Sequence, residues 1–221
     1  KCVILRPGEP DYMHRVEYDL QYQNTSAATT TSTKAAYRGS DSEGRQYDSI
    51  EEMWECQGVL PSDGDAADVS TWYNRAAQYY EENCPANLDG VLGGFANITD
   101  LDLEGSKRFI RELEALNPSF EWSSGAAAEC GAGIGRVTKG LLISLGVPKC
   151  DLIESSARLI AAAPDYLGEA ANKCKCRYFC LGLQEWYPSA NTYSMIWIQW
   201  VFCYLTDEDA VAFLKRCAES L

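Results

Sequence analysis

Hydrophobic residues between position 119 and the carboxyl end gather into four short runs that polar segments separate. Two of the runs end at Cys130 and Glu154, and two more occupy about 177–181 and 193–200. Short apolar runs bounded by turn residues are typical of buried strands. We therefore expect four strands in the last hundred residues.

Between and after these runs, the apolar positions change to helical spacing. Val137, Leu141, Leu142 and Leu145 fall on one helical face. A second helix is predicted from Ser156 toward Leu167, with a kink or an early end at Pro164 because proline lacks the amide hydrogen that a helix needs. A last helix is predicted from the cap at Thr206. Strands that alternate with helices predict an α/β fold with a parallel sheet.

The sequence before this predicted sheet predicts three helices and one glycine-rich segment. Ser49 with Glu52 forms a capping-box pattern that predicts a short helix, and aromatic residues from Trp72 to Tyr80 predict another that ends before Pro85. Glycines then interrupt the apolar segment 88–95, and a third helix closes at Asn117-Pro118.

The first part of the chain has a different composition. Residues 24–33 are small and polar, so they cannot bury enough apolar surface to order themselves. We expect a disordered segment over residues 1–37, a helical extension with a substrate loop over 38–118, and a cofactor-binding domain over 119–221. His14, the single histidine, falls in the first of these and is expected to have no role.

The stretch from Glu129 to Arg136 is the principal candidate for chemistry. It reads Gly131-x-Gly133-x-Gly135 between a strand and a helix, where glycines allow close approach of a ligand and free amide groups favour an anion. A dinucleotide fingerprint would need a further glycine where Arg136 stands. The pattern instead resembles the first motif of class I methyltransferases, which bind S-adenosylmethionine. That resemblance pairs Arg136 with the methionyl carboxylate and Glu154 with the ribose hydroxyls.

Composition and charge limit the kinds of partner that the protein is expected to bind. The chain of 221 residues has a net charge of −13, and positions 41–104 hold 15 acids against two bases. Nucleic acid is therefore not expected as a partner, whereas a cationic substrate and a merely solvated surface both remain open. No apolar run approaches the roughly 20 residues that span a bilayer, so no membrane association is expected. The scattered cysteines are read as reduced thiols, and no metal site is expected.

Four segments together resemble the alpha-N-terminal protein methyltransferases. They are Leu88–Phe95, Glu129–Lys139, Leu183–Glu185 and Ile196–Val201, and the similarity runs from about residue 70 to the end. Residues 39–54 resemble the amino-terminal extension of plant-type members. The resemblance implies methylation of the free amino terminus of proteins that begin X-Pro-Lys or X-Pro-Arg, with S-adenosylmethionine as methyl donor, in the cytoplasm and nucleus.

The resemblance also implies roles for individual residues. The cofactor would be bound by Gly131, Gly133, Arg136, Glu154, Ser155, Ser156, Leu183, Gln184 and Gln199. The peptide channel would be lined by Tyr80, Leu92, Gly93, Gly94, Ile98 and Trp200. Tyr204 stands where the family has a histidine that takes a proton from the amine, and a phenol is a poor base at neutral pH. Tyr204 is therefore a candidate for orienting the amine.

The carboxyl end departs from the family. The resemblance implies a sheet ordered 3-2-1-4 followed by three more strands, and the sequence ends before them. We expect a fragment whose fourth strand is an unpaired edge. Two alternatives to the enzyme stay open: a noncatalytic S-adenosylmethionine-binding or scaffold protein, and a methyltransferase of small molecules.

Overall fold

The computed structural model describes residues 2–5, 39–41, 44–62, 66–118 and 124–221. The chain divides into two compact units, one formed by residues 1–8 and 77–221 and the other by residues 9–76. Most of the segment expected to be disordered, including His14, lies outside the described residues.

The smaller unit contains a two-stranded hairpin and a short helix. Strands β2 (Gly39–Ser40) and β3 (Gln46–Tyr47) pair antiparallel, and helix α2 covers Ile50–Cys56. Ser49 caps α2 by accepting a hydrogen bond from the Glu52 amide, as the capping pattern predicts. Helix α3 (Ser70–Asn83) begins in this unit, and its residues from Ala77 onward belong to the larger one.

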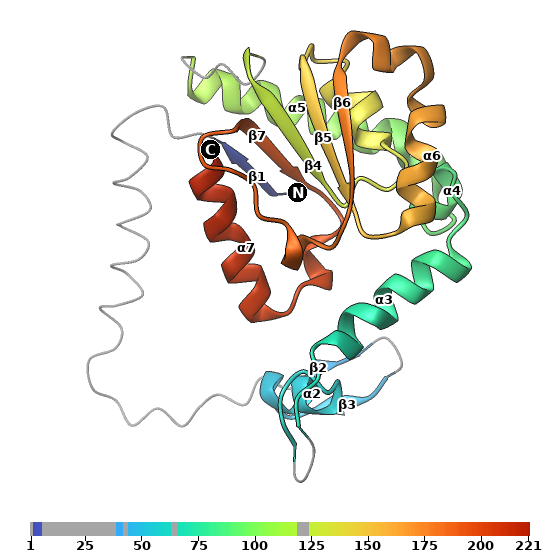
Figure 1. The fold of residues 1–221 in the computed structure, drawn as a ribbon, viewed down its shortest axis with the longest axis vertical. Helices are drawn as coiled ribbons and strands as arrows, with labels where there is room; N and C mark the ends of the chain where they lie inside the picture. Colours follow the sequence, from blue (N-terminus) through green and yellow to red (C-terminus); the bar gives the residue numbers. More distant parts are fainter. Residues whose placement is uncertain (1, 6–38, 42–43, 63–65, 119–123) are drawn as a thin grey trace, which may run out of the picture. The chain divides into compact units, whose positions relative to one another are not determined.

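A five-stranded sheet forms the centre of the larger unit (Figure 1). Strands β4 (Ala126–Cys130), β5 (Lys149–Glu154), β6 (Lys175–Cys180) and β7 (Tyr193–Ile198) are parallel, in the order β7-β4-β5-β6. This is the 3-2-1-4 order that the family resemblance implies. Because the strands are parallel, their carboxyl ends meet at one edge of the sheet, where ligands bind in open α/β folds.

The expectation of an unpaired edge at β7 is wrong. Strand β1 (Cys2–Leu5) pairs antiparallel with β7, with Cys2 opposite Ile198 and Leu5 opposite Met195. These four residues are therefore ordered as a strand within the segment expected to be disordered. The physical reason is that β1 supplies hydrogen-bond partners for backbone groups that β7 would otherwise leave unpaired.

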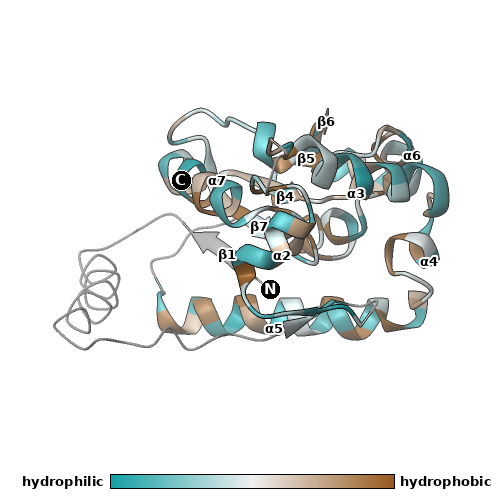
Figure 2. Ribbon diagram, turned by 90° about the horizontal axis from the view of Figure 1, so that it is seen from below, coloured by the Kyte–Doolittle hydropathy of each residue, from teal (hydrophilic) through white to brown (hydrophobic). Residues whose placement is uncertain are grey.

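Helix α5, the last helix before β4, belongs to the same core as the sheet. Helix α4 (Leu88–Val91), a 3₁₀ turn η1 (Ala96–Ile98) and helix α5 (Thr99–Leu116) follow α3. Hydrophobic and hydrophilic stretches alternate along α5 (Figure 2), and its Leu103 and Ile110 are buried with strand residues. A domain boundary at residue 118 is therefore wrong, because α5 has no separate core of its own.

The helices after β4 differ in detail from the expected ones. A π-helix η3 (Thr138–Leu142) replaces most of the first, and helix α6 (Ala157–Leu167) runs one turn past Pro164 before it ends at Gly168. Gly140 in η3 has a packing role, because a Cβ there would lie 2.3 Å from a methyl carbon of Leu103. Three 3₁₀ turns, η4 (Gly168–Lys173), η5 (Leu183–Glu185) and η6 (Phe202–Tyr204), and helix α7 (Asp207–Ser220) complete the unit.

None of the helices in the described ranges is both long enough and apolar enough to cross a bilayer.

Candidate active site

The glycine turn leaves β4 at the carboxyl edge of the sheet and folds back onto β5. The amide groups of Gly131 and Ala132 both donate to the carbonyl of Ile153, at 2.8 and 3.0 Å. Gly131 has a φ of +69°, and a Cβ at this position would lie 2.5 Å from the Cβ of Val201. A side chain is therefore excluded at Gly131 by both backbone conformation and packing.

Glu154 joins the end of β5 to the glycine turn. One carboxylate oxygen accepts from the Gly133 amide and the other from the Ser156 amide, each at 2.9 Å, and the Ser155 hydroxyl lies 3.4 Å away. The Ser156 hydroxyl caps α6 by accepting from the Leu159 amide at 3.2 Å. The structure thus brings the predicted ribose acid and the predicted glycine loop into contact.

A buried ion pair lies beside the same turn. Asp102 on α5 accepts from Arg136 at 2.9 Å and from the side-chain amide of Gln199 at 2.6 Å, and the Trp197 indole donates to Gln199 at 2.8 Å. The Arg136 and Asp102 side chains are only 6% and 9% exposed. Arg136 and Gln199, predicted to contact the methionyl group, are therefore held together by a carboxylate.

Arg136 retains binding capacity in this arrangement. Its Nη1 atom is buried and has no hydrogen-bond partner among the described residues. A buried guanidinium nitrogen without a partner is costly, and a carboxylate is the group whose geometry matches it. The residues present therefore fit a cofactor that carries a carboxylate, as S-adenosylmethionine does.

Glu129, the residue before Cys130, is the most perturbed acid of the site. Burial raises the pKa of the Glu129 carboxyl to about 7, and hydrogen bonds from the Thr138 side chain and amide oppose that rise. These hydrogen bonds connect the end of β4 to the first turn of η3. Glu129 therefore links the two elements that flank the glycine loop. The sequence reasoning gave it no role.

The segment expected to border the adenine follows β6. Leu183 is buried in η5, and Gln184 follows it. Arg216 on α7 donates to the carbonyls of Trp186 at 2.9 Å, Leu183 at 3.0 Å and Gln184 at 3.4 Å. One guanidinium group thus holds the whole turn at the carboxyl edge of the sheet.

Two residues predicted for the peptide side meet directly. The hydroxyl groups of Tyr80 and Tyr204 are 2.6 Å apart, and their rings pack edge to face with centroids separated by 5.7 Å. Burial raises the pKa of Tyr80 above its ordinary value of about 10, and the Tyr204 hydroxyl adds to the rise. Tyr80 therefore stays protonated at neutral pH and can only donate or accept a hydrogen bond.

The rest of the predicted peptide side surrounds the glycine turn less tightly. Val91 of α4 packs against the buried cluster that includes Ile134 of the turn, and a Cβ at Gly133 would lie 3.2 Å from it. The neighbouring Leu92 is therefore close to the cofactor loop. Gly93 and Gly94 are exposed in the following turn, and Ile98 is half-buried at the end of η1.

Trp200 is unusual among the predicted peptide-side residues. It is 69% exposed and has a φ of +63°, a conformation that non-glycine residues adopt rarely and mostly at functional sites. The role that Trp200, Ile98 and the two glycines would share with the tyrosine pair stays a prediction.

Asp102 is the main site residue that sequence reasoning missed. It shares a helical face with Leu103, Ser106 and Ile110, which are the buried residues of α5. A carboxylate on an otherwise apolar face is rarely buried without a partner. That signal was present in the sequence, although nothing in it named Arg136 and Gln199 as the partners.

Within the described ranges, no three histidine, cysteine or acidic side chains are grouped so that they could hold a metal ion.

The fold and this site define a class I S-adenosylmethionine-dependent methyltransferase. One similar solved structure is a SAM-dependent methyltransferase from Leishmania major, whose sequence is 36% identical to this chain. The two structures superpose with a TM-score of 0.69, and the match covers 83% of this chain and 69% of the Leishmania chain. A family model described as AdoMet dependent proline di-methyltransferase matches residues 68–221. The chain belongs to this family.

Two curated relatives show the same kinship. The N-terminal Xaa-Pro-Lys N-methyltransferase 1 of Xenopus tropicalis is 44% identical over 154 residues, which cover 70% of this chain and 67% of the relative. The alpha N-terminal protein methyltransferase 1 of Arabidopsis thaliana is 38% identical over 185 residues, which cover 80% of this chain and 64% of the relative. The chain spans about two thirds of the length of the curated relatives it matches.

Proposed function

We propose that this chain forms the cofactor-binding part of an enzyme that transfers a methyl group from S-adenosylmethionine to the free α-amino group of proteins beginning X-Pro-Lys or X-Pro-Arg. The observation that carries the proposal is the buried Asp102–Arg136–Gln199 cluster, which leaves one guanidinium nitrogen for a carboxylate beside the glycine turn. Membership of the family supports the choice of an amino-terminal substrate.

For this methyl transfer, the protein mainly has to position the amine and the cofactor. The bound cofactor supplies an electrophilic methyl group, and the amine must be uncharged to attack it. An α-amine loses its proton near pH 7.7–8.0, so a strong base is not required. Holding the two reactants at attack distance and in line provides most of the acceleration in such a displacement.

Tyr80 and Tyr204 fit the task of orienting the amine. Their hydroxyls lie within hydrogen-bond distance of each other, and Tyr80 packs against the buried cluster that includes Ile134 of the glycine turn. A phenol oxygen can accept a hydrogen bond from an amine without taking its proton at neutral pH. The pair therefore serves as a positioning element in this proposal.

The decisive experiment is methyl transfer from labelled S-adenosylmethionine to peptides. An X-Pro-Lys peptide should be labelled, and the same peptide with an acetylated amino terminus should not. Arg136→Lys should reduce the transfer strongly, because lysine cannot offer the planar pair of donors. Labelling of internal lysines or of small amines alone would refute the proposal.

A noncatalytic S-adenosylmethionine-binding protein is the second candidate. It is favoured by Tyr204, which stands where the family resemblance implies a histidine that takes a proton from the amine. Binding of S-adenosylhomocysteine with no transfer to any amino-terminal peptide, at pH 7 or pH 9, would favour it over the enzyme.

The compartment follows from the family resemblance alone, and we propose the cytoplasm and the nucleus. Fractionation of cells with an antibody to the chain tests this, and recovery in a membrane or secreted fraction would contradict it.

A further inference from the structure

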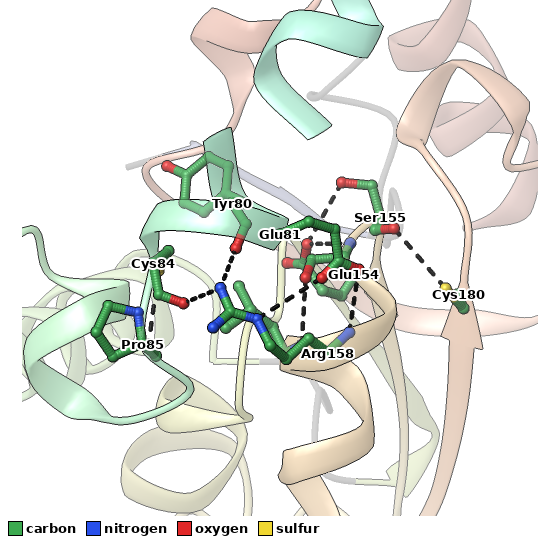
Figure 3. A network of polar contacts seen from close by, with 10 residues as sticks. Tyr80, Glu81, Cys84, Pro85, Glu154, Ser155, Arg158 and Cys180 are labelled. Atoms are coloured by element: carbon green, nitrogen blue, oxygen red, sulfur yellow. Dashed lines mark hydrogen bonds and ion pairs between the residues drawn. The ribbon is translucent and has the colours of Figure 1, made fainter. Parts of the chain in front are cut away.

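A single residue ties the amino end of α6 to the carboxyl end of α3. Nη2 of Arg158 donates to the carbonyl of Tyr80 at 2.6 Å and to the carbonyl of Cys84 (Figure 3). Its Nε lies 3.7 Å from Glu81, and its backbone amide donates to the same carboxylate at 3.3 Å. One residue thus makes four contacts with a five-residue segment.

These contacts satisfy hydrogen-bond acceptors at the carboxyl end of α3. The last carbonyls of a helix have no partner within the helix, and α3 has no basic residue in its last turn. The Arg158 guanidinium supplies both the donors and the positive charge that a helix carboxyl end favours. Its ion pair with Glu81 is about 40% exposed on each side and adds little by itself, so the carbonyl bonds are the stronger part.

The two ends that Arg158 joins serve different ligands. Helix α6 begins after Ser156, whose amide donates to Glu154 on the cofactor side. The end of α3 carries Tyr80, which meets Tyr204 on the peptide side. The side chains between them, Ile134, Leu159 and Cys84, form one small buried cluster. Arg158 therefore connects the start of α6, on the cofactor side, to the end of α3, on the peptide side.

We propose that Arg158 is a positioning residue that fixes the end of α3, and with it Tyr80 and the segment 84–98, against the cofactor edge. The proposal rests on the proposed function, because it assigns the specificity of the same site. According to this proposal, Arg158 determines the affinity for the peptide and does not affect the affinity for the cofactor.

The first test measures structure, so it does not depend on activity. Amide hydrogen exchange is compared for the wild type, Arg158→Ala, Arg158→Lys and the control Arg108→Ala, an exposed arginine of α5 that also pairs with a glutamate. Arg158→Ala should speed exchange over residues 77–98 by roughly tenfold, the effect of losing one or two strong hydrogen bonds. Exchange in α7 should not change, and Arg158→Lys should fall between.

Exchange that is unchanged over 77–98, or equally faster in α7, would overturn the proposal. The first outcome would mean that α3 keeps its place without Arg158. The second would mean that Arg158 stabilises the whole unit and has no local positioning role.

The second test separates peptide from cofactor. For Arg158→Ala, the KM of an X-Pro-Lys peptide should rise about tenfold with kcat within about twofold, and the Kd of S-adenosylhomocysteine should match the wild type. Adding Tyr80→Phe to Arg158→Ala should cost less than it does in the wild type, because residues in one network are not additive. Equal weakening of peptide and S-adenosylhomocysteine, or full additivity, would contradict the proposal.

The two tests also separate this inference from the proposed function. If the wild type transfers no methyl group to any amino-terminal peptide, the function fails, and the exchange experiment alone still decides whether Arg158 positions α3.

Discussion

The two sides of the candidate site are built in different ways. On the cofactor side, Arg136, Glu129 and Glu154 are buried and the Asp102 side chain is only 9% exposed, and each is joined to another element by hydrogen bonds or an ion pair. On the peptide side, Trp200 and the two exposed glycines that follow α4 face solvent, and the tyrosine pair is only half-buried.

This difference has an energetic meaning. Buried charges are held only where partners surround them, so the cofactor side is part of the core and losing one partner affects folding as well as binding. Exposed groups on the peptide side contribute little to folding. A change there should therefore alter recognition and leave stability nearly constant.

The largest expected effect is on the buried ion pair. Arg136→Ala leaves the Asp102 carboxylate buried without its guanidinium, which should lower the free energy of unfolding by about 3–5 kcal/mol and abolish binding of S-adenosylhomocysteine. Denaturant unfolding and calorimetric titration measure the two effects. Arg108→Ala, which removes an exposed arginine, is the control.

If Arg136→Ala does not fold, Arg136→Lys tests the same point. It keeps the charge and should fold, but its binding should be weak. A folded Arg136→Lys variant with wild-type affinity would contradict the role given to the guanidinium group.

The next effect is a pH dependence that arises on the cofactor side. The pKa of Glu129 is raised in the fold from its ordinary 4.5 to about 7, so the folded protein binds more protons than the unfolded chain between these values. Stability contributed by this group is present below pH 4.5 and is lost as the pH rises to 7. The loss amounts to about 3 kcal/mol, at about 1.36 kcal/mol for each pH unit.

Glu129→Gln removes this titration and keeps an oxygen for the Thr138 amide. Unfolding curves from pH 4.5 to 8 should show the wild type losing stability relative to the variant as the pH rises. Parallel pH profiles of wild type and variant would show that Glu129 ionises normally in the fold.

A smaller effect is expected at η5, the turn predicted to border the adenine, which Arg216 of α7 holds by hydrogen bonds. Arg216→Ala removes three hydrogen bonds to the carbonyls around η5, a loss of about 1–2 kcal/mol, or a factor of about 5–30 in the Kd of S-adenosylhomocysteine. Lys215→Ala, an exposed change on the same helix, should leave the Kd unchanged. Normal cofactor affinity in Arg216→Ala would mean that η5 keeps its shape unaided.

The smallest effect is expected on the peptide side. Tyr204→Phe removes the hydroxyl that meets Tyr80 and keeps the ring contact, which should cost about 1 kcal/mol or roughly a fivefold rise in peptide KM. The melting temperature and the Kd of S-adenosylhomocysteine should not change. A drop in stability as large as that expected for Arg136→Ala would break the contrast between the two sides.

The sequence predicted much of the cofactor side. The four parallel strands, the glycine turn and the acid at the end of β5 appear in the structure where the pattern placed them, and the strand order is the one that the family resemblance implies. The peptide side was predicted mainly from family resemblance, and of its residues the structure brings Tyr80 and Tyr204 into contact. The helix after the glycine turn was wrong in type, because residues 138–142 wind as a π-helix.

Local features of the sequence are therefore what determined the elements. Strand and helix patterns depend on neighbours a few residues apart, and a glycine turn needs only its own backbone freedom, so both can be read along the chain.

Tertiary structure alone decided which distant groups meet. Arg136 finds Asp102 across 34 residues, Arg158 finds the carbonyl of Tyr80 across 78, and β1 pairs with β7 from the other end of the chain. Periodicity indicates that a face is buried but not which partner satisfies a charge or a strand edge, because that choice depends on the packing of the whole sheet.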